Sequence, residues 1–562
     1  MFKRRGYRPP EPPPRFARIL NTVGSSFRVV KTIGSLVLLK SMAERMGLRS
    51  LVDSLIPMER ESESGLTHGQ VVESLVMNRC HAPVPLYEME QWAQAGGMAD
   101  FYGCSAERFN DDRMRMTLDR LPEHETNVQD AMALRLMNEF QVPADEVLYD
   151  ITSLYFEGAY DESALIHLGY SRDQKPDKKQ VNIALTVSRQ GGVPLRSQTL
   201  SGETADPTTV EANVRALKKT LQRKQFLQIT DGAMLTPANV HMLETEGISF
   251  LAPWRADTAI LDAVQGDHVP WEPLAYRGAK GQDRYWTTEL GVLVTYEEVL
   301  TDQAAPTRQP GQRGRLPQHP KQIHAHWERA VVVRSSSKQR RDEKTRIKQL
   351  QKLETALNAI QSGLNRQRLK TQKQVDAKLE NLFSGPYAMY RRCAETNLDG
   401  PDGEMTFAWS WNPVPLERLK SREGLYVLLT NRKDSEADPV ETLLERYKGR
   451  NLVESRIRDL KSHIKLHPLY VHTDVRVQAL VLITVLALQL YSLIEWEAAK
   501  AQQAWTTSFL KKKFAQVSLL QTLHPDGTVE IEWCNLLPTH LTILKTLGLQ
   551  LAQPPTRLAP FT

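Results

Sequence analysis

The chain changes character at VLYDITSLYF, residues 147–156, where an apolar and β-branched run predicts a buried β-strand. Two more strand-like runs follow, QVNIALTVS (180–188) and VPLRSQTL (193–200), and Gly191-Gly192 before the latter indicates a hairpin turn. The pattern then alternates between a helix over 210–221, the strand FLQIT (226–230), a helix over 237–246 and the strand SFLAPW (249–254). This order predicts an α/β fold, a mixed sheet with flanking helices.

Upstream, residues 15–145 are predicted to be helical, with Thr67 as the cap of a helix that begins at His68 and further helices near 86–94 and 111–121. Residues 1–14 are basic and proline-rich, which predicts a disordered tail.

Downstream, residues 257–430 interrupt the α/β pattern and are interpreted as an insertion, with strand-like runs at 291–296, 329–333, 406–411 and 424–430 and a proline-rich loop near 306–320. Within the insertion, segment 338–382 is predicted to form a basic helical hairpin that turns near 363–365. Its apolar seam is expected to comprise Ile347, Leu350, Leu353, Leu357, Ile360 and Leu364.

Residues 431–500 are expected to complete the core with one long helix near 440–463 and an apolar helix over 477–494. The apolar run is close to the length of a membrane span. However, Gln478 and Gln489 interrupt it and no partner span exists, which favours a buried core helix. Residues 501–562 carry little pattern beyond a turn signal at 524–528.

Composition excludes several classes of protein. With 562 residues the chain is too long for one core, and 41% hydrophobic with 25% charged residues argues against disorder and fibres. Four scattered cysteines and no CxxC pair exclude a disulfide framework and a zinc ribbon. No export signal is visible, so we expect a cytoplasmic protein.

Positive charge is concentrated in one segment. The net charge is +6, but residues 338–378 alone hold 12 basic and 4 acidic side chains. A basic element on a neutral body is typical of proteins that bind nucleic acid, although a solvated charged helix has the same composition.

Two aspartates are candidate site residues. Asp150 lies inside the first strand, where a carboxylate is costly unless it is paired, hydrogen-bonded or bound to a metal. Asp231 ends the strand 226–230, and ligands gather at the carboxyl ends of strands in α/β sheets. The alternatives are a strand edge facing water for Asp150 and an Asp-Gly turn for Asp231.

A third carboxylate, Glu454, lies in YKGRNLVESRIRDLKSHIK, residues 447–465. On a continuous helix, Tyr447, Arg450, Glu454 and Lys461 would share one stripe about 60° wide. The alternative is a solvated helix face with ion pairs such as Glu454–Arg458.

Three carboxylates suit Mg²⁺, which prefers oxygen ligands, and a pair of such ions can activate water or a 3′-hydroxyl in phosphodiester cleavage. Arg450 and Lys461, with Arg458 nearby, would bind DNA phosphates, and Tyr447 would stack on a base or bond a phosphate.

The chain resembles the DDE transposases of bacterial insertion sequences, in the branch with a Tyr-x2-Arg-x3-Glu-x6-Lys signature. YKGRNLVESRIRDLK fits that signature at every spaced position. The resemblance extends to LYDITSLYFEG (148–158), ITDGAMLTPANV (229–240), GLYVLLTN (424–431) and three N-terminal runs at 66–80, 85–93 and 109–121, so it covers roughly residues 20–550.

The resemblance implies a ribonuclease H-like core in which Asp150, Asp231 and Glu454 are catalytic and bind Mg²⁺, with Mn²⁺ as a substitute. It implies hydrolysis at transposon ends, attack of the freed 3′-hydroxyl on target DNA, and a homodimer when ends are paired. It also implies an insertion before the glutamate, which matches the 223 positions from Asp231 to Glu454. The chain departs from the family at Gly232, where Ala or Arg is usual, and at Glu203, where Asn is frequent.

The expected organisation is a tail (1–14), a helical region that binds DNA ends (15–145), the first part of the catalytic core (146–256), the insertion (257–430), the second part of the core (431–500) and a C-terminal region (501–562). We expect DNA as the partner, in the bacterial cytoplasm, with no membrane. No phosphate-binding loop is present, so no nucleotide cofactor is expected.

Two other functions remain open, a metal-dependent nuclease that cuts without joining and a non-catalytic DNA-binding protein derived from a transposase. Zinc binding by His463, His467 and His472 is not favoured, because no HExxH pattern accompanies them. His324 and His326 carry no further signal.

Overall fold

The computed structural model describes residues 27–58, 65–158, 160–223, 225–255, 258–265, 269–278, 281–300, 319–366, 368–464, 473–524 and 529–554. The chain forms two compact units: unit 1 comprises Met1–Ile229 and Gly449–Thr562, and unit 2 comprises Thr230–Lys448. The predicted tail at 1–14, and most of the proline-rich loop and of the turn at 524–528, lie outside the described residues.

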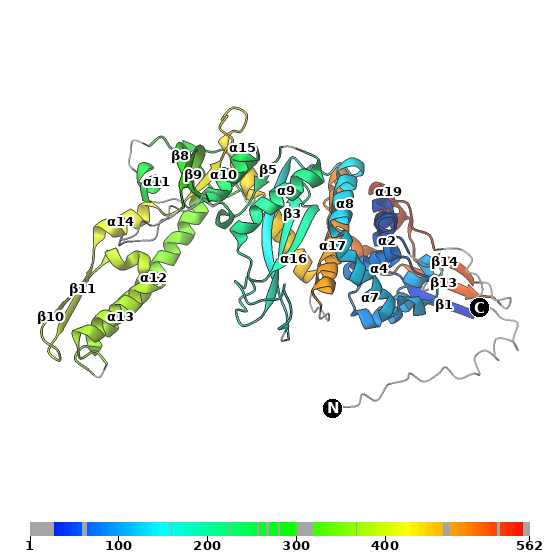
Figure 1. The fold of residues 1–562 in the computed structure, drawn as a ribbon, viewed down its shortest axis with the longest axis horizontal. Coiled ribbons are helices and arrows are strands. Elements are labelled where there is room, and N and C mark those ends of the chain that lie inside the picture. The colour runs from blue at the N-terminus through cyan, green and yellow to red at the C-terminus, as the bar shows by residue number, and fades with distance from the viewer. Residues whose placement is uncertain are drawn as a thin grey trace, which may run out of the picture. The chain divides into compact units, whose positions relative to one another are not determined.

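The first part of unit 1 is mainly helical, as predicted for residues 15–145 (Figure 1). Its helices are α2 (Leu36–Met46), α3 (Leu48–Leu55), α4 (His68–His81), α5 (Met89–Ala95), α6 (Met98–Tyr102), α7 (Asp111–Arg120) and α8 (Glu125–Glu139), with short 3-10 helices η1 (Leu86–Glu88), η2 (Ala106–Phe109) and η3 (Leu121–His124). Thr67 caps α4 as expected, because its side chain accepts the N–H of Gln70.

This region is not entirely helical, because the strand β1 (Phe27–Thr32) precedes α2. β1 pairs antiparallel with β13 (Ser518–Leu523), which pairs in turn with β14 (Val529–Cys534). The sequence does not indicate this pairing, which joins strands almost 500 residues apart in the chain. The remaining C-terminal helices are α18 (Thr507–Lys513) and α19 (Pro538–Thr546).

The sheet of unit 1 follows the predicted order of elements: β2 (Glu146–Tyr155), β3 (Gln180–Ser188), β4 (Pro194–Ser201), η4 (Asp206–Thr209), α9 (Val210–Leu221) and β5 (Leu227–Ile229). The strands lie in the order β4-β3-β2-β5, with β3 antiparallel to both neighbours and β2 parallel to β5. These features are those of a ribonuclease H-like sheet, so the predicted fold class is confirmed.

The apolar run at 477–494 belongs to α17 (Asp474–Lys500), the one helix of the described residues that is long and apolar enough to span a membrane. However, 94% of its most apolar window is buried, because α17 packs on α2, α4, α7 and β4. Gln489 fits this environment by donating its Nε2–H to the Pro194 carbonyl oxygen (3.0 Å). The prediction of a core helix is confirmed.

The prediction of one long helix near 440–463 is wrong. The structure has two helices, α15 (Val440–Lys448) in unit 2 and α16 (Asn451–Ser462) in unit 1. The break falls at Gly449, a residue type that costs about 1 kcal/mol relative to Ala in a helix interior. Beyond it, the N–H groups of Leu452 and Val453 bond to carbonyls three residues back, as in a tight first turn.

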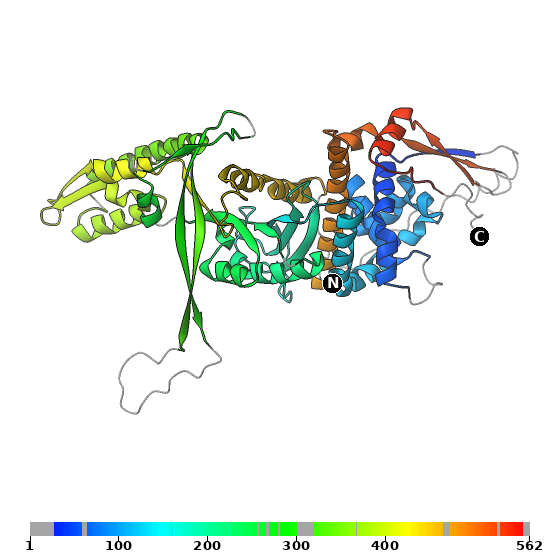
Figure 2. The same ribbon diagram turned by 90° about the horizontal axis from the view of Figure 1, so that it is seen from above.

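Unit 2 begins with η5 (Gly232–Met234), α10 (Pro237–Thr245), β6 (Ser249–Trp254) and α11 (Thr258–Ala263). Its strands lie in the order β6-β12-β9-β8-β7, and the further members are β7 (Glu272–Pro273), β8 (Tyr285–Val299), β9 (Lys321–Ser335) and β12 (Leu425–Thr430). β8 and β9 form a long twisted two-stranded ribbon (Figure 2). Helix α10 packs against both of these strands.

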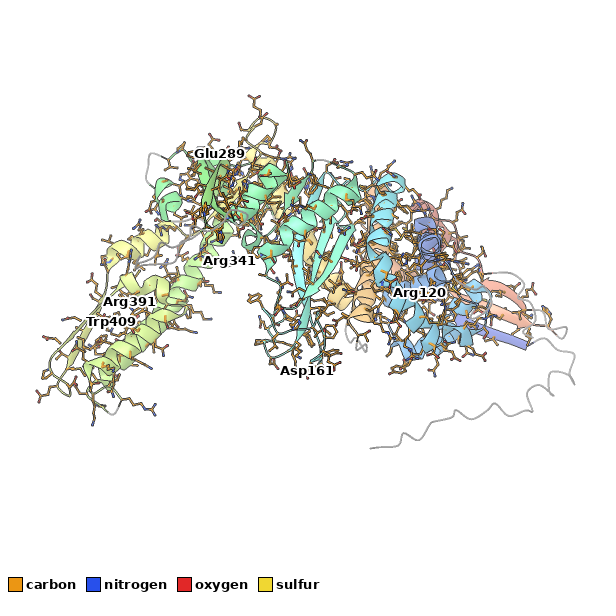
Figure 3. All side chains as sticks on the ribbon, in the orientation of Figure 1. Arg120, Asp161, Glu289, Arg341, Arg391 and Trp409 are labelled. Carbon is orange, nitrogen blue, oxygen red and sulfur yellow. The ribbon has the colours of Figure 1, made fainter. Side chains whose placement is uncertain are left out.

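The basic helical hairpin is present as α12 (Ser336–Gly363) and α13 (Gln372–Ser384), followed by η6 (Ala388–Cys393), β10 (Ala394–Asp399), β11 (Thr406–Trp411) and α14 (Pro413–Ser421). Leu353, Leu357 and Ile360 of α12 are buried in a small core of this module, as predicted. The prediction that Ile347 belongs to the same apolar seam is wrong, because its side chain is 45% exposed. Arg391 of η6 and Trp409 of β11 lie in this module (Figure 3).

Candidate active site

Asp150 lies on β2, between the buried residues Tyr149 and Ile151. β2 has a neighbour on each side, β3 and β5, so the alternative of an edge strand is wrong. The Asp150 carboxylate is partly exposed, and its Oδ1 accepts the N–H of Ile151 (2.9 Å). Tyr149 points to the opposite face of the strand, where it donates to Thr209 Oγ1 (2.7 Å) and burial raises its pKa.

Asp231 follows β5 and caps η5, where its Oδ1 accepts the N–H of Gly232 (2.5 Å). The Asp-Gly turn that the sequence allowed is therefore present, but it does not bury the carboxylate, which is partly exposed. The last parallel pair of β2 and β5 is Leu148 with Ile229. Asp150 and Asp231 each lie two residues beyond that pair, Asp150 still within β2 and Asp231 after the end of β5.

Glu454 lies in the first turn of α16, which packs on β2 and β3. Its side chain is 45% exposed and pairs with Arg450 (NH2–Oε1 3.0 Å), rather than with Arg458 as the alternative had it. The helix that carries Glu454 thus covers the strand that carries Asp150, while the carboxylate itself stays open to solvent.

Arg456 fixes the position of α16. It is 5% exposed, donates to the carbonyl oxygens of Gly191 (2.9 Å) and Gly192 (3.0 Å), and forms an ion pair with Glu495 of α17 (2.7 Å). Gly192 has a φ of +61°, and a Cβ there would lie 2.7 Å from Leu452 Cγ. The predicted hairpin turn between β3 and β4 is therefore packed closely against α16 and hydrogen-bonded to it.

The shared stripe predicted for the four signature residues depends on a continuous helix, and the break at Gly449 removes that basis. Tyr447 lies on α15 of unit 2, where its ring is 6.2 Å from that of Tyr426. Lys461 lies on α16 and pairs with Asp173 (2.7 Å), and Arg458 is exposed on the same helix.

Unit 2 contains a group of acidic and histidine side chains that the sequence did not predict as a site. Glu244, His326 and Glu328 of unit 2 each offer one ligand atom, and these atoms lie within 4.8 Å of one another, the one such group among the described residues. A period of two along β9 places His324, His326 and Glu328 on one face, a signal that the sequence contains but that is common in strands. The spacing of residues along the sequence does not indicate that Glu244 of α10 lies beside this face of β9.

His463 lies 3.7 Å from Asp459, and His467 and His472 lie outside the described residues.

The model of the transposase DDE domain matches residues 143–490, more than half of the chain. The chain belongs to this family. A second model, a domain of unknown function (DUF4277), matches residues 28–132. This family assignment confirms the resemblance to DDE transposases, and the matched residues include Asp150, Asp231 and helix α16.

Solved structures of other transposases resemble this DDE transposase at low identity. A piggyBac transposase synaptic complex with hairpin DNA is 11% identical over 87% of this chain and 82% of that chain, with a TM-score of 0.37. A Mos1 transposase paired-end complex with the left transposon end is 12% identical over 34% and 61%, with a TM-score of 0.15. No curated protein matches the sequence.

Proposed function

We propose that this DDE transposase cuts DNA at transposon ends and joins the freed 3′-hydroxyl to target DNA, with Asp150, Asp231 and Glu454 as its catalytic, metal-binding residues. The observation that carries the proposal is the common position of Asp150 and Asp231 beyond the last parallel pair of β2 and β5. The packing of the Glu454 helix on β2 supports it.

The donor set fits Mg²⁺ or Mn²⁺, since it consists of three carboxylates, each of which is partly or fully exposed. A divalent ion held there would activate the attacking water or hydroxyl and stabilise the leaving oxygen. Among the residues of the chain, Arg450 is placed to hold Glu454 in position, because it lies one helical turn before it and pairs with it.

The proposed DNA contacts are Tyr447, Arg450, Arg458 and Lys461. Arg458 is exposed on the same helix as Glu454, and the Lys461 side chain, which pairs with Asp173, is 24% exposed. Both are therefore available to phosphates without a change in backbone structure.

We extend the proposal to the regions of the chain. Residues 15–145 would bind transposon ends, 146–256 and 431–500 would form the catalytic core, and the basic hairpin of the 257–430 insertion would follow the DNA backbone. The protein would act on DNA in the bacterial cytoplasm, as a homodimer when two ends are paired.

A cleavage and joining assay tests the proposal. Purified protein is incubated with Mg²⁺, a target plasmid and a donor that carries the DNA flanking the reading frame. We expect nicked ends and joined products, both of which disappear in D150N, D231N and E454Q. The matched control is E441Q, the same change at an exposed position of α15, which should retain both activities.

Each alternative function predicts a different pattern in this assay. Cleavage without joined products at any target concentration would indicate a nuclease. DNA rearrangement that is unchanged in D150N and E454Q would show that these carboxylates are not catalytic. Either result would contradict the proposal, provided that gel-shift experiments show equal DNA binding by the variants.

A further inference from the structure

A group of side chains between α10 and the β8–β9 ribbon has no role in the proposed reaction. Glu244 comes from α10, while His326 and Glu328 come from β9, and their ligand atoms lie within 4.8 Å of one another. All three belong to unit 2, and none belongs to the signature of the family.

Glu328 is the unusual member of the group. It is 2% exposed, and among the described residues neither of its carboxylate oxygens has a hydrogen-bond partner other than the Glu244 carboxyl group. Its nearest cation, the Lys433 ammonium, is 3.9 Å away, beyond hydrogen-bond distance. A buried carboxylate without a donor is costly, so the structure calls for a cation or a proton at this place.

Glu244 adds to the same requirement, because its Oε1 is buried and also lacks a hydrogen bond. Glu328 is buried and Glu244 is partly exposed, and two neighbouring carboxylates repel each other unless a positive charge lies between them.

The histidine of the group is held in place by its surroundings. His326 Nε2 lies 2.9 Å from His241 Nδ1, which fixes the orientation of the His326 ring. The His241 ring stacks on that of His324 at 4.0 Å, and His324 in turn lies 2.8 Å from Glu298 Oε2. The imidazole of His326 therefore has little freedom to turn.

We infer that Glu244, His326 and Glu328 form a binding site for a divalent transition-metal ion, with Zn²⁺ as the best fit. An imidazole beside two carboxylates suits Zn²⁺, whereas Mg²⁺ prefers oxygen alone. Ligand bonds of about 2.0–2.2 Å place donor atoms roughly 3.5 Å apart, and the ligand atoms of this group lie within 4.8 Å of one another. The ion would fasten α10, the helix after Asp231, to β9.

Zinc binding by the full-length protein tests the inference. The metal-free protein is titrated with Zn²⁺ against a chromophoric chelator, in millimolar Mg²⁺ to occupy sites made of oxygen alone. We expect one Zn²⁺ per chain, and an affinity lower by more than about 100-fold in E328Q and H326N, since loss of an outer partner alone costs 10–100-fold. E297Q, a change at an exposed glutamate of β8 outside the group and its supporting contacts, is the matched control and should bind as the unaltered chain does.

X-ray absorption of the zinc-loaded protein gives a second readout that does not depend on how well a variant folds. Oxygen and nitrogen ligands with an imidazole signature support the site. Sulfur ligands, or equal zinc affinity in E328Q, H326N and the unaltered chain, would overturn it. In the latter case Glu244 and Glu328 share a proton instead. Because Asp150, Asp231 and Glu454 are outside the group, E454Q should bind zinc normally whether or not the proposed catalysis is correct.

Discussion

Replacement of Arg456 by Ala should loosen the helix that carries Glu454 without changing any proposed catalytic residue. The substitution removes hydrogen bonds to the carbonyl oxygens of Gly191 and Gly192 and leaves Glu495 and Asp459 without their shared cation. Breaking a buried ion pair by removal of one partner costs about 3–5 kcal/mol. At about 1.4 kcal/mol per tenfold change, local opening of α16 should become roughly 10²- to 4 × 10³-fold more frequent.

Hydrogen–deuterium exchange of peptides that cover 451–462 measures this opening. The matched control is R458A, which removes the same charge from an exposed position of the same helix and should change opening by less than about 0.5 kcal/mol. Equal exchange rates of the 451–462 peptides in R456A and R458A would contradict the prediction that Arg456 holds α16 in place. In R456A, exchange of α12 in unit 2 should stay unchanged.

Three further predictions concern stability. L353A should lower the free energy of unfolding of the α12–α13 module by about 2–5 kcal/mol in urea denaturation, whereas I347A, at a 45% exposed position, should cost below about 0.5 kcal/mol. G192A should lower the free energy of unfolding by about 1–2 kcal/mol because of its positive φ, and by roughly a further 1–3 kcal/mol because of the clash with Leu452. G247A, which has a similar φ and open space around it, should show only the first of these losses. Equal losses in the two variants would contradict the close packing of Gly192 against α16. Burial lowers the pKa of His81 to about 4, below its ordinary value of 6.5. Between these pH values the unfolded state binds a proton at His81 and the folded state does not, so the free energy of unfolding should fall as the pH drops from 6.5 to 4. A pH series of urea midpoints should show a smaller fall in H81N, and an identical fall in both proteins would show that His81 is not responsible.

Sequence periodicity predicts the elements of the core well because their burial patterns are strong. The strand-like run at 180–188 and the alternating α/β order between 147 and 254 leave few other arrangements, and the structure confirms both, with every residue of 180–188 buried. The sequence predicts the basic hairpin equally well, because the spacing of its apolar residues and the residues of its turn are visible within one short segment.

Two kinds of feature escaped the sequence. The break at Gly449 is one, because a glycine inside a helix costs only about 1 kcal/mol relative to alanine, which is too little to decide from the sequence whether the helix continues. Long-range pairing is the other: β1 with β13, and Glu244 with Glu328, join residues whose separation in the chain gives no local signal. The common position of Asp150 and Asp231 depends on strand register, which only the structure provides.

The central claim is that Asp150, Asp231 and Glu454 hold the same metal ions. Crystals of the protein with a transposon end and Mn²⁺, measured at the manganese absorption edge, test it most directly. Anomalous peaks within about 2.5 Å of all three carboxylates are the predicted result. Manganese bound elsewhere, with the three carboxylates directed to separate places, would contradict it.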